Sequence, residues 1–93
     1  MSVDPDLLSL FPTSCAVDTD GALSVGGIRL TALARQFGTP VQIVDETALR
    51  QRAREFAHGL TRRRPGSSVA FASKSFPCTA IYRVMAEEGL HID

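Results

Sequence analysis

The sequence predicts an α/β fold in which helices connect the strands of a parallel sheet. Two observations support this class. In residues 41–93, segments with helical apolar periodicity alternate with short apolar runs, and the connections between them are short. A strand–helix–strand order of this kind is typical of parallel sheets. Ninety-three residues suit at most one small domain, and the 44% hydrophobic content is typical of globular proteins.

A glycine pair predicts a β-hairpin in the N-terminal half. Gly26 and Gly27 lie between two short apolar runs, residues 22–25 and 28–30. Both central positions of a two-residue hairpin turn can require positive φ, which glycine adopts without steric cost. The preceding residues, 4–15, are expected to form an arm with a helical turn near its leucines.

A short helix and a strand are expected after the hairpin. Thr31 can cap a helix that runs to Phe37 and ends at Gly38. Residues 41–44 then predict a strand. Asp45 is a good N-cap for the helix that follows.

That following helix should carry one apolar stripe. Leu49, Ala53, Phe56 and Leu60 recur at spacings of four, three and four, which place them on one helical face. A loop over residues 61–67 is expected behind it.

A further helix is predicted near the C-terminal end. Pro77 fits its first turn, with the cap at Ser75 or Phe76, and Gly89 fits the position just beyond its last turn. Residues 90–93 then begin another strand. The expected buried stripe of this helix consists of Ile81, Val84 and Met85.

Lys74 is the only lysine of the chain, since the other nine of the ten Lys and Arg residues are arginine. It follows residues 68–73, an apolar run consistent with a strand buried on both faces. A guanidinium stays protonated and cannot attack a carbonyl, whereas an ε-amine can. Lys74 is therefore a candidate imine-forming residue. The alternative is an ordinary lysine that extends from a strand end into solvent.

Strand alternation places Lys74 on one face with Ala70 and Ala72, whose small side chains leave space beside it. Asp93 ends the next strand and should reach the same sheet edge, where ligands of parallel α/β folds bind. The alternative for Asp93 is a helix cap or a loop residue. His91 is expected to be a lone, partly buried histidine.

Composition argues against several classes of function. The formal net charge is zero, so no field draws the chain to nucleic acid or an anionic membrane. The arginines at 62–64 adjoin a Pro-Gly loop and are expected to be solvated. No apolar stretch is long enough to span a bilayer. Neither histidine has a partner at metal-ligand spacing, so no metal is expected, and Cys15 and Cys78 should be reduced thiols of a cytoplasmic protein.

Three ordered segments carry a family resemblance. They are Phe-Gly-Thr-Pro with the strand behind it at 37–45, Phe-Ala-Ser-Lys-Ser-Phe at 71–76, and Ala-Glu-Glu-Gly-Leu with the final aspartate at 86–93. Together they resemble the N-terminal part of the diaminopimelate decarboxylase family, pyridoxal-phosphate enzymes of the alanine-racemase-like barrel group. The resemblance covers nearly the whole chain from Phe11 onward.

The resemblance implies an activity and its residues. A full-length member would convert meso-diaminopimelate, a small amino-acid substrate, to L-lysine and carbon dioxide in lysine biosynthesis. Lys74 would hold pyridoxal 5′-phosphate covalently, with Ala72 and Asp93 beside the cofactor and Ala70 in the floor of the site. The full-length enzyme would be a cytoplasmic homodimer without nucleic-acid or membrane partners.

The resemblance also implies a division of the chain. Residues 1–45 would supply an arm, a hairpin and a strand to a β-domain, and residues 46–93 would begin a (β/α)₈ barrel. Such a barrel takes about 250 residues, so the chain is expected to be truncated and inactive by itself. Two alternatives remain: a related barrel decarboxylase for another basic amino acid, and a non-catalytic cofactor-binding or regulatory homologue.

Overall fold

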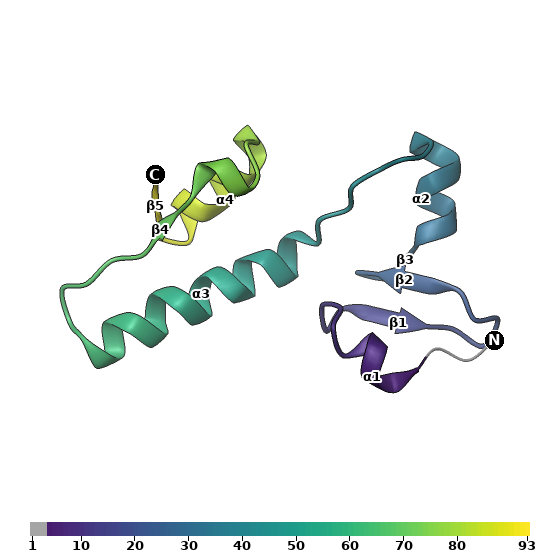
Figure 1. Ribbon diagram of the computed structural model, residues 1–93, viewed down its shortest axis with the longest axis horizontal. Coiled ribbons are helices and arrows are strands. Elements are labelled where there is room, and N and C mark those ends of the chain that lie inside the picture. Colours follow the sequence, from purple (N-terminus) through teal and green to yellow (C-terminus); the bar gives the residue numbers. More distant parts are fainter. Residues whose placement is uncertain (1–3) are drawn as a thin grey trace. The chain divides into compact units, whose positions relative to one another are not determined.

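The computed structural model describes residues 4–93 and divides the chain into two compact units, Met1–Ala48 and Leu49–Asp93 (Figure 1). The expected division at residue 45 into a β-domain part and a barrel part stays a prediction, and its first three residues lie outside the described range. Among the helices of residues 4–93, none combines the length and the apolar character needed to cross a membrane.

The first unit is built on a three-stranded antiparallel sheet in the order β1-β2-β3. The predicted hairpin is confirmed, because Gly26 and Gly27 both have positive φ, at 59° and 82°. Helix α2 ends at Gly38, whose φ is 80°, as expected. The elements are α1 (Pro5–Leu8), β1 (Cys15–Val17), β2 (Leu23–Val25), β3 (Ile28–Arg29) and α2 (Leu30–Phe37).

The sequence did not reveal strand β1, which pairs with β2. Asp18 organises the turn between the two strands, because its Oδ1 accepts the backbone N–H groups of Asp20 and Ala22, each at 2.9 Å. Arg29 also forms an ion pair with the Asp18 carboxylate. Its hydrogen bond to this carboxylate is the main reason that the pKa of Asp18 lies below its ordinary value. The helical turn α1 begins two residues earlier than its leucines suggested.

Two expectations for the first unit are wrong. Helix α2 begins at Leu30 after Arg29, so Thr31 lies inside the helix and does not cap it. Residues 41–44 form no strand. A strand exists only where a neighbouring strand takes its backbone hydrogen bonds, and no segment of residues 4–93 pairs with them.

The second unit contains a strand–helix–strand element with parallel strands, as predicted. Strand β4 pairs with β5 in the register Ala70–His91 and Phe71–Ile92. Helix α3 begins after Asp45, whose Oδ1 accepts the N–H groups of Thr47 and Ala48, so the expected cap is confirmed. The elements are α3 (Glu46–Arg63), β4 (Ala70–Phe71), the 3₁₀ turn η1 (Ser73–Ser75), α4 (Thr79–Glu87) and β5 (His91–Ile92).

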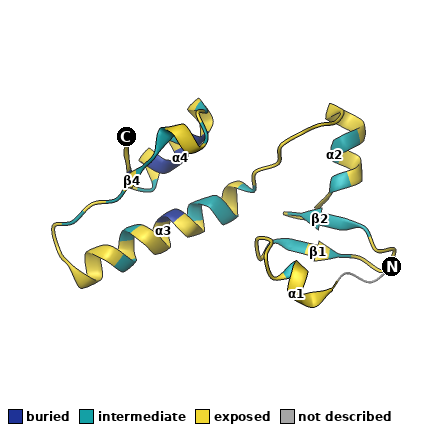
Figure 2. Cartoon of the chain, in the orientation of Figure 1, coloured by how far each residue is buried: buried dark blue, intermediate teal, exposed yellow. Residues whose placement is uncertain are grey.

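The core of the second unit lies between α3, α4 and the two parallel strands (Figure 2). The stripe predicted for α4 is confirmed, since its three members are buried. The stripe of α3 is covered in part: Ala53 is 4% exposed, whereas Phe56 is 64% exposed. The buried residues are Ala53, Ile81, Val84, Met85 and Leu90.

Gly89 ends α4 as predicted. Its φ is 86°, the Leu90 N–H donates to the Met85 carbonyl at 2.9 Å, and the Gly89 N–H donates to the Ala86 carbonyl at 3.0 Å. These two bonds form a Schellman motif, which turns the chain from the helix into β5.

Several boundaries in the second unit differ from expectation. Helix α3 continues to Arg63, so the loop predicted at 61–67 begins three residues later. Helix α4 begins at Thr79 with Cys78 at the cap position, because Ser75 and Phe76 belong to or follow the 3₁₀ turn. The cap predicted at Ser75 or Phe76, with Pro77 in the first helical turn, is therefore wrong.

The run at 68–73 is a two-residue strand rather than a longer one buried on both faces. Ala70 is exposed and Phe71 is half-buried. His91 is exposed rather than partly buried. Ala70, Phe71 and His91 are incompletely covered for the same reason, because β4 and β5 each have only one neighbouring strand within residues 4–93.

Candidate functional site

Lys74 lies in the 3₁₀ turn η1, between strand β4 and helix α4, and its side chain is exposed. The alternation argument from sequence is therefore wrong at this position. Strand β4 ends at Phe71, and the turn behind it breaks the two-residue period that would put Lys74 on one face with Ala70 and Ala72. Ala70 is exposed, whereas Ala72 is half-buried at the start of the turn.

Local hydrogen bonds close the turn around Lys74. The Ser75 N–H donates to the Ala72 carbonyl at 3.1 Å, and the Ser75 hydroxyl donates to the same oxygen at 2.8 Å. The Phe76 N–H donates to the Ser73 carbonyl at 3.3 Å. Serine favours such turns because its hydroxyl can reach a backbone carbonyl three residues away.

Asp93 is joined to the same turn through the backbone. Its N–H donates to the Phe71 carbonyl at 2.9 Å, and its carbonyl accepts the Ser73 N–H at 3.1 Å. These bonds continue the parallel ladder past β4 and β5, so the backbone of Asp93 lies beside the residue that precedes Lys74. Both residues therefore lie at the carboxyl end of the parallel pair, where ligands of α/β folds bind.

Tyr82 is a neighbour of this turn that the sequence did not single out. Its hydroxyl lies 3.4 Å from the Ser73 carbonyl oxygen and donates to it. Its ring lies against Phe71, with ring centroids 6.4 Å apart and an angle of 59° between the planes. Tyr82 is the single tyrosine of the chain, which is the one signal that could have drawn attention to it.

A cluster of charged side chains joins α3 to the end of α4. Arg54 Nε lies 2.6 Å from Glu88 Oε1, Arg50 Nη1 lies 3.0 Å from Glu88 Oε2, and Arg50 Nη2 lies 2.7 Å from Glu87 Oε2. The Glu88 side chain is 10% exposed. Hydrogen bonds from Arg54 and then Arg50 hold the pKa of Glu88 below its ordinary value. The cluster links α3 to the end of α4 immediately before Gly89, where the chain turns into β5.

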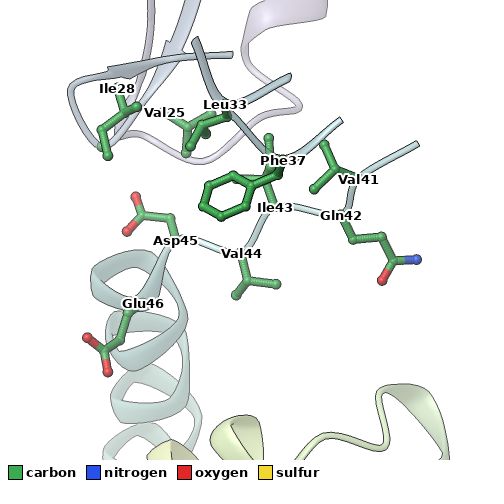
Figure 3. Close-up of a pocket in the computed structure, with 11 residues that line it drawn as sticks. Val25, Ile28, Leu33, Phe37, Val41, Gln42, Ile43, Val44, Asp45 and Glu46 are labelled. Carbon is green, nitrogen blue, oxygen red and sulfur yellow. The ribbon is translucent and has the colours of Figure 1, made fainter. Parts of the chain in front are cut away.

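The first unit contains an open apolar hollow of about 360 Å³ between the hairpin, α2 and the segment before α3 (Figure 3). Phe37 and Ile43 lie close together in it, and Asp45 lies at its edge near Ile28. The pKa of Asp45 lies below its ordinary value, mainly because of the neighbouring Ser14 hydroxyl. The lining is mainly aliphatic, with the ring of Phe37, and its polar side chains are Gln42, Asp45 and Glu46.

The structure thus gathers Lys74, Ala72 and the Asp93 backbone at one sheet edge and leaves Ala70 exposed on the strand behind them. Their roles toward a cofactor stay predictions. Cys15 and Cys78 are free thiols in different units.

Comparison with known proteins gives one consistent result. No family model matches the chain. It is 41% identical over 86 residues to a diaminopimelate decarboxylase of Synechocystis, covering 91% of this chain and 18% of the relative. The identity is 47% over 73 residues to the enzyme of Actinosynnema pretiosum, covering 78% and 16%, and 39% over 92 residues to that of Mycobacterium leprae, covering 95% and 19%.

The chain spans less than a fifth of the length of these relatives. The similar stretch includes nearly all of the chain in two of the three comparisons, so it takes in both units. The chain is therefore homologous to a segment of diaminopimelate decarboxylase.

Proposed function

We propose that the chain is the N-terminal part of a pyridoxal-phosphate-dependent decarboxylase that converts meso-diaminopimelate to L-lysine and carbon dioxide. The observation that carries the proposal is the position of Lys74. It is the chain's sole lysine, and it is exposed at the carboxyl end of a parallel strand pair. It also lies in a segment that is homologous to diaminopimelate decarboxylases.

Lys74 fits the chemistry of the cofactor. A primary amine can bond covalently to the aldehyde carbon of pyridoxal phosphate, and Lys74 is exposed at the sheet edge where such a ligand would lie. When bound, the cofactor supplies a conjugated ring that takes up the electron pair left by the departing carboxylate. With its Nζ free, Lys74 would hold or deliver a proton at the substrate α-carbon.

Ala72 and Asp93 are assigned supporting roles. Ala72 directly precedes the turn, and its small side chain is assigned to the space beside the cofactor. Asp93 lies at the same sheet edge, where its carbonyl accepts the Ser73 N–H. Its carboxylate is assigned an electrostatic role toward the cofactor. Neither residue makes or breaks a bond in this proposal.

The larger context is part of the same proposal. Residues 1–45 would belong to a β-domain and residues 46–93 would begin a (β/α)₈ barrel, in a cytoplasmic homodimer. The parallel pair β4–β5 joined by α4 supports the barrel, because that unit repeats around it. The antiparallel sheet of the first unit supports a separate β-domain.

The test is Lys74→Arg in a full-length enzyme that contains this segment. The variant keeps the positive charge and removes the attacking amine, so turnover should fall by about a thousandfold or more. The absorbance of the covalently bound cofactor and its borohydride-reducible adduct should disappear, while the circular dichroism spectrum stays unchanged. Meso-diaminopimelate is compared with ornithine and arginine, and a preference for either of these would give the enzyme a different substrate.

A matched control returns one lysine to the chain at a different place. Arg83 is exposed on α4, so Arg83→Lys should be active alone and should not rescue Lys74→Arg. A reducible adduct that persists in Lys74→Arg would show that another lysine of the full-length enzyme holds the cofactor.

The 93-residue chain by itself is expected to form no lysine from meso-diaminopimelate. Decarboxylation needs a cofactor held in one orientation by groups from several elements, and an exposed amine gives at most a weak, reversible adduct. The measurement is lysine production by purified chain, cofactor and substrate. Saturable production above that of free cofactor, abolished by Lys74→Arg, would contradict the expectation.

A further inference from the structure

Two hydrogen bonds join the turn that carries Lys74 to other elements of the second unit, and both involve the backbone of Ser73. The Ser73 N–H donates to the Asp93 carbonyl at 3.1 Å, which ties the turn to the strand edge. The Ser73 carbonyl accepts two bonds, from the Phe76 N–H at 3.3 Å and from the Tyr82 hydroxyl at 3.4 Å. The first of these bonds lies within the turn, whereas the second comes from α4.

Tyr82 is held in place independently of this hydrogen bond. It lies on α4 next to the buried Ile81, and its half-buried ring packs against Phe71 of β4. The ring therefore has little freedom, so its hydroxyl is presented to the Ser73 carbonyl without much loss of side-chain entropy on bonding.

A 3₁₀ turn depends on such outside support. Its hydrogen bonds have poorer geometry than those of an α-helix, and runs this short have no neighbouring turns to stabilise them. The bond within the turn at Ser73 is 3.3 Å long, and Lys74 itself is exposed. The support for the backbone of Lys74 therefore comes from the residues on either side of it.

We propose that Tyr82 is a positioning residue for Lys74. Its hydroxyl donates a hydrogen bond to the Ser73 carbonyl and thereby keeps the turn that carries Lys74 closed at the sheet edge. This inference rests on the proposed function of Lys74. Tyr82 does not touch the reacting atoms in this proposal, and its effect passes through the turn.

The first measurement is amide hydrogen exchange in a full-length enzyme that contains this segment. Tyr82→Phe removes the hydroxyl and keeps the ring, so the Phe76 amide should exchange about threefold faster, as expected for the loss of one weak hydrogen bond. The Leu90 amide, bonded to Met85 in the core, should be unchanged. Ser67→Ala is the control, because it removes a hydroxyl from the loop that precedes β4. It should alter neither rate.

The second measurement is turnover in the full-length enzyme, divided by the amount of cofactor that borohydride traps on Lys74. This ratio corrects for any loss of folded or loaded protein, which a purely structural role would cause. It should fall about threefold in Tyr82→Phe, with KM for meso-diaminopimelate unchanged. Tyr82→Leu also removes the ring contact and should lower it further.

The inference is overturned by an unchanged Phe76 exchange rate in Tyr82→Phe, or by a turnover per trapped cofactor equal to that of the parent. Equal acceleration at Phe76 and Leu90 also overturns it, because it would mean that Tyr82 stabilises the whole unit. If the parent enzyme shows no adduct and no turnover, the proposed function fails, and the exchange rates alone decide whether Tyr82 holds the turn.

Discussion

The two units of the chain are stabilised in different ways. The first unit is an antiparallel sheet with two short helices, α1 and α2, and its paired strands lie close in sequence. The second unit is a parallel pair with a crossover helix, and it brings together residues more than thirty positions apart, such as Arg54 and Glu88. Of residues 4–93, every buried hydrophobic residue lies in the second unit.

This difference shows what each unit needs from its sequence. A tight hairpin closes a loop of few residues, so glycines and an Asp-centred turn are enough to specify it. A parallel pair has no such local signal and depends on packing of the helix between its strands. Residues 4–48 of the first unit include no buried hydrophobic residue, and Phe37 and Ile28 are 65% and 52% exposed.

The largest expected effect contrasts a buried residue of the second unit with an exposed residue of the first. Met85→Ala should destabilise the second unit by about 2–5 kcal/mol, because Met85 is 4% exposed and its loss leaves a cavity. Phe37→Ala should change stability by at most about 0.5 kcal/mol, because Phe37 is largely exposed. The measurement is exchange of the His91 amide, which bonds to the Val69 carbonyl, and of the Gly26 amide in the first unit.

Equal losses in the two variants would remove the distinction between the units. A large loss in Phe37→Ala would mean that the hollow of Figure 3 is covered in solution, for example by a second copy of the chain. Repeating the exchange at several protein concentrations separates these outcomes, because association makes protection depend on concentration.

A smaller effect is expected at Glu88, which links the two helices of the second unit. A carboxylate at a helix C-terminus is disfavoured by the helix dipole, so its two arginine partners are needed to hold it there. The folded-state pKa of Glu88 is below its ordinary value of 4.5. Its stabilisation is therefore complete above pH 4.5 and is lost as the pH falls through the lower folded value.

Glu88→Gln should remove that acid-sensitive part of the stability. The measurement is a pH series of the exchange of the Leu90 amide in the parent and the variant. Glu55→Gln is the matched control, because Glu55 pairs with Arg52 on the exposed side of α3. A parent and a Glu88→Gln variant with the same acid response would rule out this role.

The smallest effect is expected in the first unit, at the start of α3. Asp45→Ala removes the cap and should speed exchange of the Thr47 and Ala48 amides, whereas Asp45→Asn should retain most of the protection because asparagine caps equally well. The folded-state pKa of Asp45 lies below its ordinary value of 3.8. Its charge therefore contributes fully to stability above pH 3.8, and this contribution is lost as the pH falls through the lower folded value. Identical exchange in all three proteins would show that the cap does not stabilise the helix.

The sequence by itself determined the features that depend on neighbouring residues. The hairpin at Gly26 and Gly27, the cap at Asp45, the buried stripe of α4 and the end of that helix at Gly89 all follow from backbone geometry or from the helical period. The family resemblance was likewise visible in short ordered segments, and the comparisons confirm it.

Only the tertiary structure decided the features that depend on distant partners. Residues 41–44 have strand-like composition and form no strand, because nothing in the described chain pairs with them. The run before Lys74 ends early in a 3₁₀ turn, whose closure involves Asp93 and Tyr82, residues 9 or more positions from Ser73. Local propensity cannot encode such contacts, because a backbone group takes the partner that the fold brings to it.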